Sequence, residues 1–136
     1  MAVTPNSIVT PQTPKAAGVG LATSANTNYA APTNTTLVLT AGSNGARLTK
    51  LKAIPCATIT ATQLQLFRSA DSGTTKRFCN SALMAAYTMA QTTQAPQTDF
   101  GFSDVNPLVL GAGEQLYMAV GVGGVQINVE AEWADY

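Results

Sequence analysis

The chain has 136 residues, only 10% of them charged, and its seven Lys and Arg balance its seven Asp and Glu to a net charge of zero. An average soluble domain carries roughly 25% charged residues, and a small monomer usually keeps a net charge that prevents association. The chain also lacks histidine, which is the commonest general base and metal ligand. The composition therefore indicates a subunit of an assembly and argues against an enzyme, and we expect no catalytic residue, metal or cofactor.

The length predicts a single domain that can bury a real core. Neutral polar residues replace the missing charges, and Thr alone, whose β-branched side chain favours strands, occurs 19 times. No apolar run approaches the roughly 18 residues of a membrane span, and the first ten residues lack the basic and apolar parts of a signal peptide. We therefore expect a β protein without membrane contact, with Cys56 and Cys79 buried and reduced.

Residues 1–17 are predicted to form an extended N-terminal arm. Pro5, Pro11 and Pro14 are spaced through this stretch, and proline removes a backbone donor and fixes φ, so the stretch cannot be a helix or an inner strand. It is either a frayed terminus or an arm that orders on a neighbouring subunit, and the sequence favours neither. We expect residues 18–136 to form one domain that still folds when residues 1–17 are deleted.

Strand patterns dominate from residue 18 onward. They are separated by clusters of Gly, Asn, Asp and Pro, which favour turns. The predicted strands cover residues 19–25, 35–41, 47–54, 57–68, 75–79, 108–110, 114–122 and 125–134. The stretch 81–91, which contains Ala and Met, fits either a short helix or an extended segment, and its β surroundings favour the extended form.

The last of these strands has the clearest pattern. Val125, Ile127, Val129, Ala131 and Trp133 alternate with polar or small residues, as in a strand with one buried and one exposed face. We therefore expect Trp133 to be buried. Seven or eight short strands, without a long helix or an internal repeat, predict an all-β sandwich or barrel.

No stretch of the sequence forms a convincing catalytic constellation. Glu130 and Glu132 lie on one strand face, but solvated or partner-facing carboxylates are expected on the polar face of such a strand. The glycines at 111–113 and 121–124 lack the Lys-Ser/Thr of a phosphate loop and open no helix. They therefore predict hairpin turns rather than a phosphate site.

The charges are unevenly distributed along the chain. Residues 1–78 sum to +6, from seven bases and one acid, and residues 79–136 sum to −6, from six acids. Either strands from the two halves interleave and neutralise each other within the subunit, or parts of both sets face outward as patches that select partners. The bases have no interleaved aromatic residues, which argues against nucleic-acid binding. The candidate partner-binding residues are Lys15, Arg47, Lys50, Lys52, Glu130 and Glu132.

Two segments of the chain resemble a known family. They are residues 67–73 (FRSADSG) and residues 107–117 (PLVLGAGEQLY), and residues 35–136 as a whole are similar to the small jelly-roll cement, or head-decoration, proteins of tailed bacteriophages. The resemblance implies a jelly-roll-like antiparallel β-sandwich that sits on the outside of a capsid lattice. There it would bridge neighbouring major capsid proteins as a dimer or trimer and stiffen the shell against the pressure of the DNA inside.

The resemblance agrees with the physical argument. A jelly roll leaves edge strands that can accept strands from other chains, and many weak contacts together hold a shell through avidity. We therefore expect a non-enzymatic virion protein on the capsid exterior, made in the bacterial host cytoplasm. Its expected partners are the major capsid protein and its own copies, without direct nucleic-acid contact. The alternative is a carbohydrate- or receptor-binding module of a phage tail or fibre, which would need exposed aromatic side chains.

Overall fold

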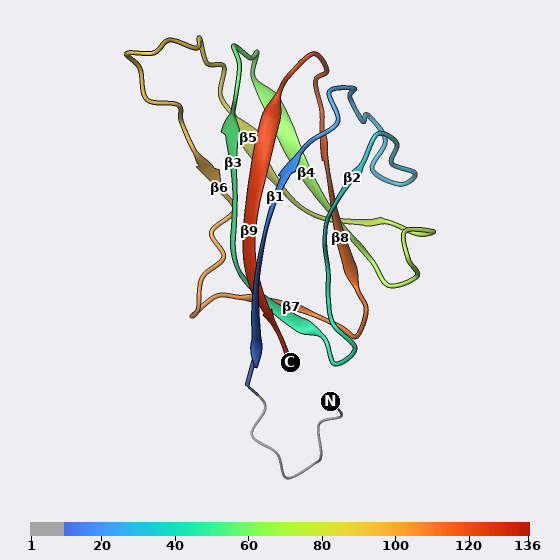
Figure 1. The fold of residues 1–136 in the computed structure, drawn as a ribbon. Coiled ribbons are helices and arrows are strands. Elements are labelled where there is room, and N and C mark those ends of the chain that lie inside the picture. Colours follow the sequence, from blue (N-terminus) through green and yellow to red (C-terminus); the bar gives the residue numbers. More distant parts are fainter. Residues whose placement is uncertain (1–9) are drawn as a thin grey trace.

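The computed structural model describes residues 10–136 and contains nine strands and no helix in that part of the chain (Figure 1). In chain order the strands are β1 Thr13–Gly20, β2 Thr36–Thr40, β3 Ala46–Pro55, β4 Thr62–Ser69, β5 Arg77–Met84, β6 Thr98–Asp99, β7 Leu108–Leu110, β8 Gln115–Val120 and β9 Ile127–Asp135. The predicted strand 108–110 coincides with β7, and six others overlap β2, β3, β4, β5, β8 and β9 with shifted ends. The predicted strand 19–25 shares only residues 19 and 20 with β1, and the two-residue β6 has no predicted counterpart.

The strands form two antiparallel sheets. One has the order β1-β9-β3-β6, with β7 also paired to β3, and the other has the order β2-β8-β4-β5. Since β6 and β7 share one side of β3, the pairs are nested: β1 with β9, β2 with β8, β3 with β6 and β7, and β4 with β5. This is the strand order of a jelly roll. The predicted all-β, jelly-roll-like antiparallel sandwich is therefore confirmed.

β9 shows how the sequence pattern builds the sandwich. Its residues alternate, with Val129, Ala131 and Trp133 in the core and Glu130 on the outer face. The largest fully buried side chains are mainly aliphatic and include Leu48, Leu51, Leu64, Leu66, Met84, Leu110, Leu116 and Met118. The predicted burial of Trp133 is confirmed, because one face of β9 packs against the second sheet.

β1 begins at Thr13, inside the stretch predicted as an arm. It pairs with β9 along its whole length and is the edge strand of its sheet, a position that tolerates Pro14 because one side of the strand needs no donor. The predicted boundary between residues 17 and 18 therefore falls inside a strand, and deleting residues 1–17 would remove most of it. Residues 1–9 of the predicted arm lie outside the described residues.

The ambiguous stretch 81–91 is extended, as its β surroundings predict. β5 continues through Met84, and an isolated antiparallel bridge then joins Tyr87 to Ile59. In this bridge each residue donates its N–H to the other's C=O, at 2.9 and 3.1 Å. The stretch thus extends the β framework beyond the end of β5.

Candidate interaction surface

The outer face of the five-stranded sheet carries opposite charges on adjacent strands. β3 contributes Lys50 and Lys52, and β9 contributes Glu130 and Glu132. The register places Lys50 opposite Glu132 and Lys52 opposite Glu130. The distances between Nζ and Oε2 are 3.1 Å for the first pair and 3.6 Å for the second. We call these four residues the charge ladder.

The charge ladder is open to solvent. The Glu130 and Glu132 side chains are 53% and 45% exposed. The hydrogen bond with Glu132 and the attraction of its charge raise the pKa of Lys50, so this lysine is protonated at neutral pH. Exposed ion pairs contribute little to folding. The main result of the charge ladder is therefore an exposed surface with a positive row on β3 beside a negative row on β9.

Lys15 lies outside the charge ladder. Its Nζ is 2.6 Å from Oδ2 of Asp135, on the neighbouring strand β9. Asp135 is buried, and its Oδ1 accepts a hydrogen bond from the N–H of Gly42 at 3.1 Å. Lys15 therefore neutralises a buried carboxylate within the subunit and ties the edge strand to the end of the sandwich.

Arg47 also makes its observed contact within the subunit. It lies on β3 opposite Val109 of β7, and its Nη2 donates a hydrogen bond to the backbone C=O of Asp104. Its Nε is buried and has no hydrogen-bond partner among residues 10–136. The guanidinium thus holds the loop between β6 and β7 against the sheet.

The fold interleaves the two oppositely charged halves of the chain. The four ion pairs found among the described residues each join a base before residue 78 to an acid after residue 98. Of the two alternatives that the charge distribution left open, neutralisation within the subunit is the one observed. The outward-facing charges form a ladder of mixed sign rather than two opposed patches.

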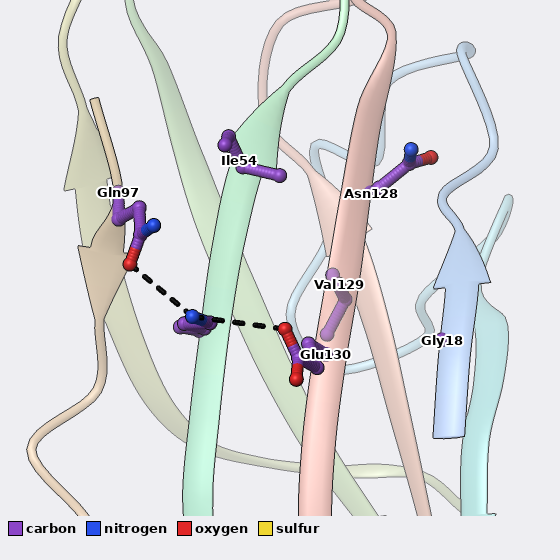
Figure 2. Close-up of a pocket in the computed structure, with 7 residues that line it drawn as sticks. Gly18, Ile54, Gln97, Asn128, Val129 and Glu130 are labelled. Atoms are coloured by element: carbon purple, nitrogen blue, oxygen red, sulfur yellow. Dashed lines mark hydrogen bonds and ion pairs between the residues drawn. The ribbon is translucent and has the colours of Figure 1, made fainter. Parts of the chain in front are cut away.

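A shallow hollow of about 290 Å³ lies on the same face, beside the charge ladder (Figure 2). Its lining is mainly apolar and consists of Gly18, Lys52, Ile54, Gln97, Asn128, Val129 and Glu130. At one wall, Nζ of Lys52 donates a hydrogen bond to Oε1 of Gln97 at 3.3 Å. At the other wall, Gly18 has open space, since an added Cβ would meet nothing within 4 Å. The hollow therefore reaches the edge strand β1.

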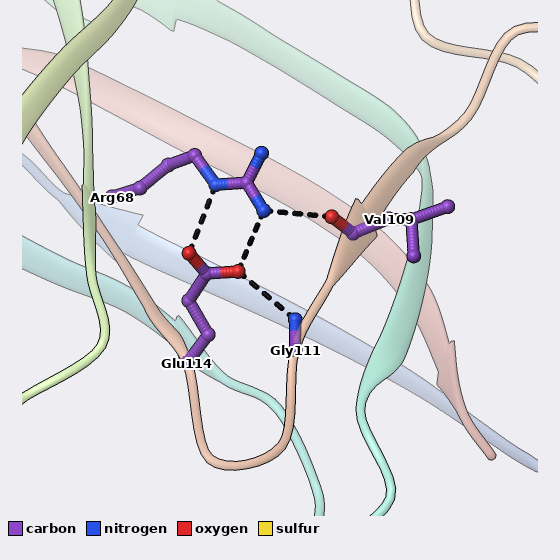
Figure 3. A network of polar contacts seen from close by, with 4 residues as sticks. All are labelled: Arg68, Val109, Gly111 and Glu114. Atoms are coloured by element: carbon purple, nitrogen blue, oxygen red, sulfur yellow. Dashed lines mark hydrogen bonds and ion pairs between the residues drawn. The ribbon is translucent and has the colours of Figure 1, made fainter.

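An ion pair joins β4 to the turn between β7 and β8 (Figure 3). Arg68 donates two hydrogen bonds to the carboxylate of Glu114 and a third, at 2.8 Å, to the C=O of Val109. Glu114 also accepts a hydrogen bond from the N–H of Gly111 at 3.0 Å. The bonds from Arg68 lower the pKa of Glu114, and the same contact raises the pKa of Arg68. This pair is a structural anchor that the sequence analysis did not single out.

The outer face of the four-stranded sheet carries buried residues that the sequence analysis missed. Gln65 and Phe67 are almost fully buried, although the alternate residues Leu64 and Leu66 already fill the core. The connection between β1 and β2 covers Gln65, since Nδ2 of Asn26 in this connection donates to Oε1 of Gln65 at 2.8 Å. Phe67 packs against Phe78 of β5, with ring centroids 5.5 Å apart. Both faces of β4 are therefore buried. The period-two pattern of its sequence could not show that another segment covers its outer face.

Exposed aromatic rings lie at the margin of this cover. Tyr29 stacks on Phe78, with ring centroids 4.2 Å apart and planes 8° apart. The two residues are 45% and 37% exposed. A neighbouring hollow of about 300 Å³ is lined by Asn26, Thr27, Tyr29, Gln63, Gln65, Gly121 and Val122. An aromatic surface beside amide side chains thus lies on the opposite sheet from the charge ladder.

The predicted burial of the cysteines is wrong. Cys56 and Cys79 are both exposed, and neither forms a disulfide. Cys56 follows the last residue of β3, in a turn. Cys79 lies on the edge strand β5 at a register shift, where Phe78 and Asn80 pair with consecutive residues of β4. Edge and turn positions leave one side of a residue without neighbours, so these small apolar side chains reach the surface.

Residues 10–136 contain neither a metal-binding cluster nor a membrane-spanning helix. In this part of the chain, no group of three or more His, Cys, Asp or Glu residues is arranged to hold a metal ion. The same residues include no helix that is long and apolar enough to cross a membrane.

No protein-family model and no curated protein matches this sequence. Among solved structures, a chain in the structure of infectious bursal disease virus, Gt strain, aligns with 98% of this chain at 9% identity and a TM-score of 0.32. The alignment covers 35% of the viral chain, so this chain spans about a third of its length. A similarity this low carries no argument about function, and the fold assignment rests on the strand order described above.

Proposed function

We propose that the protein is a non-enzymatic structural subunit that binds the outside of a bacteriophage capsid and cements neighbouring major capsid proteins. The observation that carries this proposal is the charge ladder, an exposed row of ion pairs on one face of the sandwich. The resemblance of residues 35–136 to cement proteins supplies the class of partner. The jelly-roll strand order is the fold that this resemblance implies.

The charge ladder offers a partner both signs of charge at a fixed spacing. The two lysines lie along β3 and the two glutamates along the neighbouring strand β9, about 4.8 Å away. A capsid segment with complementary charges is therefore attracted in one position and repelled when it is displaced by one strand. The many neutral polar side chains of the chain suit a hydrated, hydrogen-bonded contact. Each contact is weak because its charges are exposed, and many copies acting together hold the shell.

Binding of the full chain to empty capsid shells tests this proposal. We expect the double variant Glu130→Lys, Glu132→Lys to bind at least about tenfold more weakly, a loss of about 1.4 kcal/mol. The control is Ser81→Lys, Leu83→Lys, which adds positive charge at two exposed positions of β5 in the other sheet and should bind as the wild type does. Wild-type binding should also weaken as salt is raised to about 0.5 M, because salt screens exposed charges.

Two results would contradict the proposal. Equal binding by the two double variants, or binding that salt does not weaken, would reject the charge ladder as the contact with the shell. Electron microscopy of the native particle tests the location independently. We expect density for the sandwich on the capsid exterior, and density on a tail or fibre would exclude a cement role.

The second candidate is a carbohydrate-binding module, and the exposed pair Tyr29 and Phe78 favours it. Aromatic faces pack against apolar sugar faces, and the adjoining hollow has amides from Asn26 and Gln63. This candidate predicts binding on a glycan array that Tyr29→Ala abolishes and Tyr29→Phe retains. Absence of binding to any glycan, or glycan binding that Tyr29→Ala leaves unchanged, would exclude it.

A further inference from the structure

Among residues 10–136, no strand pairs with the outer edge of β1, which we call its free edge. β1 is the outermost strand of the five-stranded sheet. The N–H of Leu21, just after β1, donates to the C=O of Ile127 on β9, and the direction of the backbone groups alternates along an antiparallel strand. The odd-numbered residues of β1 therefore bond to β9. Ala16, Gly18 and Gly20 point their N–H and C=O groups away from the sheet.

This edge lacks the usual protection against a further strand. Edge strands are commonly protected by charged residues, proline or a bulge. Pro14 and Lys15 provide such protection only at the start of β1, because residues 16–20 are Ala, Gly and Val. The pairing of β1 with β9 contains no register shift, so the strand is regular along its length. Residues 16–20 thus form an uncharged acceptor for an extended segment.

The apolar hollow described above adjoins the same edge. Figure 2 shows Gly18 on β1 at one side of this hollow and Ile54 on β3 at the other. A strand added beside β1 would place every second side chain on this face of the sheet. An apolar side chain of the added strand, next to Gly18, would then extend across this glycine into the hollow.

The chain enters β1 from the side away from its free edge. The N–H of Gln12 donates to the C=O of Asp135 on β9 at 2.8 Å. Pro11 lines a hollow together with Asp104, whose loop packs beside β3. The described chain therefore starts beside β9, away from the free edge of its own β1. This starting point favours the edge of a second copy over the edge of the same subunit.

We propose that residues 1–9 of a second copy of this chain pair as an additional strand with the free edge of β1. The segment MAVTPNSIV has no charged side chain, which matches the uncharged edge. Nine extended residues span about 30 Å and the eight residues of β1 about 26 Å, so the segment can cover the edge. Exchange in both directions gives a closed dimer with two-fold symmetry.

Pro5 determines which side chains face the hollow. In a strand at the new sheet edge, proline is tolerated where its missing N–H would point to solvent. The odd-numbered residues of the segment then direct their backbone groups outward, and the even-numbered residues bond to β1. Directly opposite residues share a face of the sheet, so Ile8 lies on the face of Gly18, next to the hollow.

This inference goes beyond attachment to a capsid, because it concerns contact between copies in the absence of shells. Sedimentation velocity of the full chain tests it. We expect the wild type to dimerise and Ala16→Pro to dissociate at least about tenfold more readily, because this proline removes only an outward-pointing N–H, as Pro14 already does. The control Ala16→Val keeps the N–H and should dimerise as the wild type does.

A second pair of variants lies outside the sandwich and is independent of how β1 folds. Ile8→Asp places a charge against the apolar hollow and should weaken the dimer at least about tenfold. Asn6→Asp adds the same charge two residues earlier on the same strand face, replaces a side chain that is already polar, and should have little effect. A labelled peptide of residues 1–12 should bind the Ala16→Val chain and fail to bind the Ala16→Pro chain.

Each possible result decides the question. A wild-type chain that is monomeric at about 100 µM and binds no peptide overturns the proposal, and so does equal dimerisation of Ala16→Pro and Ala16→Val. Equal dimerisation of Ile8→Asp and Asn6→Asp overturns the role of the segment. A wild-type chain that dimerises but does not bind shells would count against the proposed capsid contact alone, so the two proposals fail separately.

Discussion

Arg68 and Glu114 form a two-pronged ion pair, with Nε to Oε2 at 3.0 Å and Nη2 to Oε1 at 2.6 Å. Arg68 lies in the segment 67–73 and Glu114 in the segment 107–117, the two segments that resemble cement proteins. One charged contact therefore joins them in space. Because Glu114 also accepts the N–H of Gly111, the pair fixes the turn between β7 and β8 against β4.

We predict that Glu114→Gln lowers the free energy of unfolding by about 1–2 kcal/mol at pH 7, because two charge-assisted hydrogen bonds lose their charge. Urea unfolding followed by circular dichroism measures this. Glu132→Gln is the matched control, since Glu132 is paired but about half exposed, and its unfolding midpoint should stay close to that of the wild type. Equal midpoints for the two variants would show that the Arg68 pair does not stabilise the fold.

The same pair predicts a pH dependence with a definite sign. Arg68 lowers the pKa of Glu114 below its ordinary value of 4.5, so the folded state binds this proton less readily than the unfolded state does. The resulting stability is fully present above the unfolded-state pKa and is lost as the pH falls through the lower, folded-state pKa. The difference between wild type and Glu114→Gln should therefore shrink below pH about 4.5. A difference that stays constant down to pH about 2 would contradict this.

The alternation in β9 predicted its buried face, including Trp133, because one side of that strand packs on the core and the other meets solvent. The pairing of Lys50 with Glu132 could not be read from the sequence. It depends on strands about 80 residues apart and on the register shift between Leu48 and Lys50, and period-two patterns carry no information on strand order. The burial of Gln65 could not be predicted for a related reason, since the loop that covers it is distant in the sequence.

A glycine in the turn between β2 and β3 is predicted to be essential for stability. Gly45 has φ +91°, and an added Cβ would lie 2.5 Å from the backbone oxygen of Leu110. Gly45→Ala therefore combines left-handed strain of about 1 kcal/mol with a backbone clash, and we expect a total loss of about 3 kcal/mol or more. Gly101→Ala is the control, since Gly101 has φ +83° and open space around it. Urea unfolding should show the strain alone at Gly101, and equal losses at both positions would refute the clash.

The loop that covers the four-stranded sheet is predicted to depend on Gln65. Gln65 exchanges two hydrogen bonds with Asn26, from Asn26 Nδ2 at 2.8 Å and to the Asn26 C=O at 3.1 Å. Gln65→Leu keeps most of the volume but leaves buried polar groups of Asn26 unpaired, so we expect a loss of about 2 kcal/mol. A double-mutant cycle with Asn26→Ala measures the coupling. Strictly additive losses would mean that the two side chains do not stabilise each other.

The two cysteines are predicted to differ in reactivity although both reach the surface. Cys79 is exposed as a residue, but partial burial of its thiol raises the pKa of Cys79 from 9.0 to about 11, and its Sγ donates a hydrogen bond to the C=O of Leu66 at 3.4 Å. At pH 8, a thiol with a pKa of about 11 has about a hundredfold less thiolate than a thiol with a pKa of 9.0. The thiolate of higher pKa is more nucleophilic, which partly offsets this difference, so we expect labelling of Cys79 to be at least about tenfold slower than labelling of Cys56. Cys56→Ser and Cys79→Ser each leave a single thiol, and labelling by iodoacetamide followed by mass spectrometry gives the two rates. The rate at Cys79 should keep rising up to pH about 10. Equal rates at pH 8 would show that the Cys79 thiol is not protected by its position in β5.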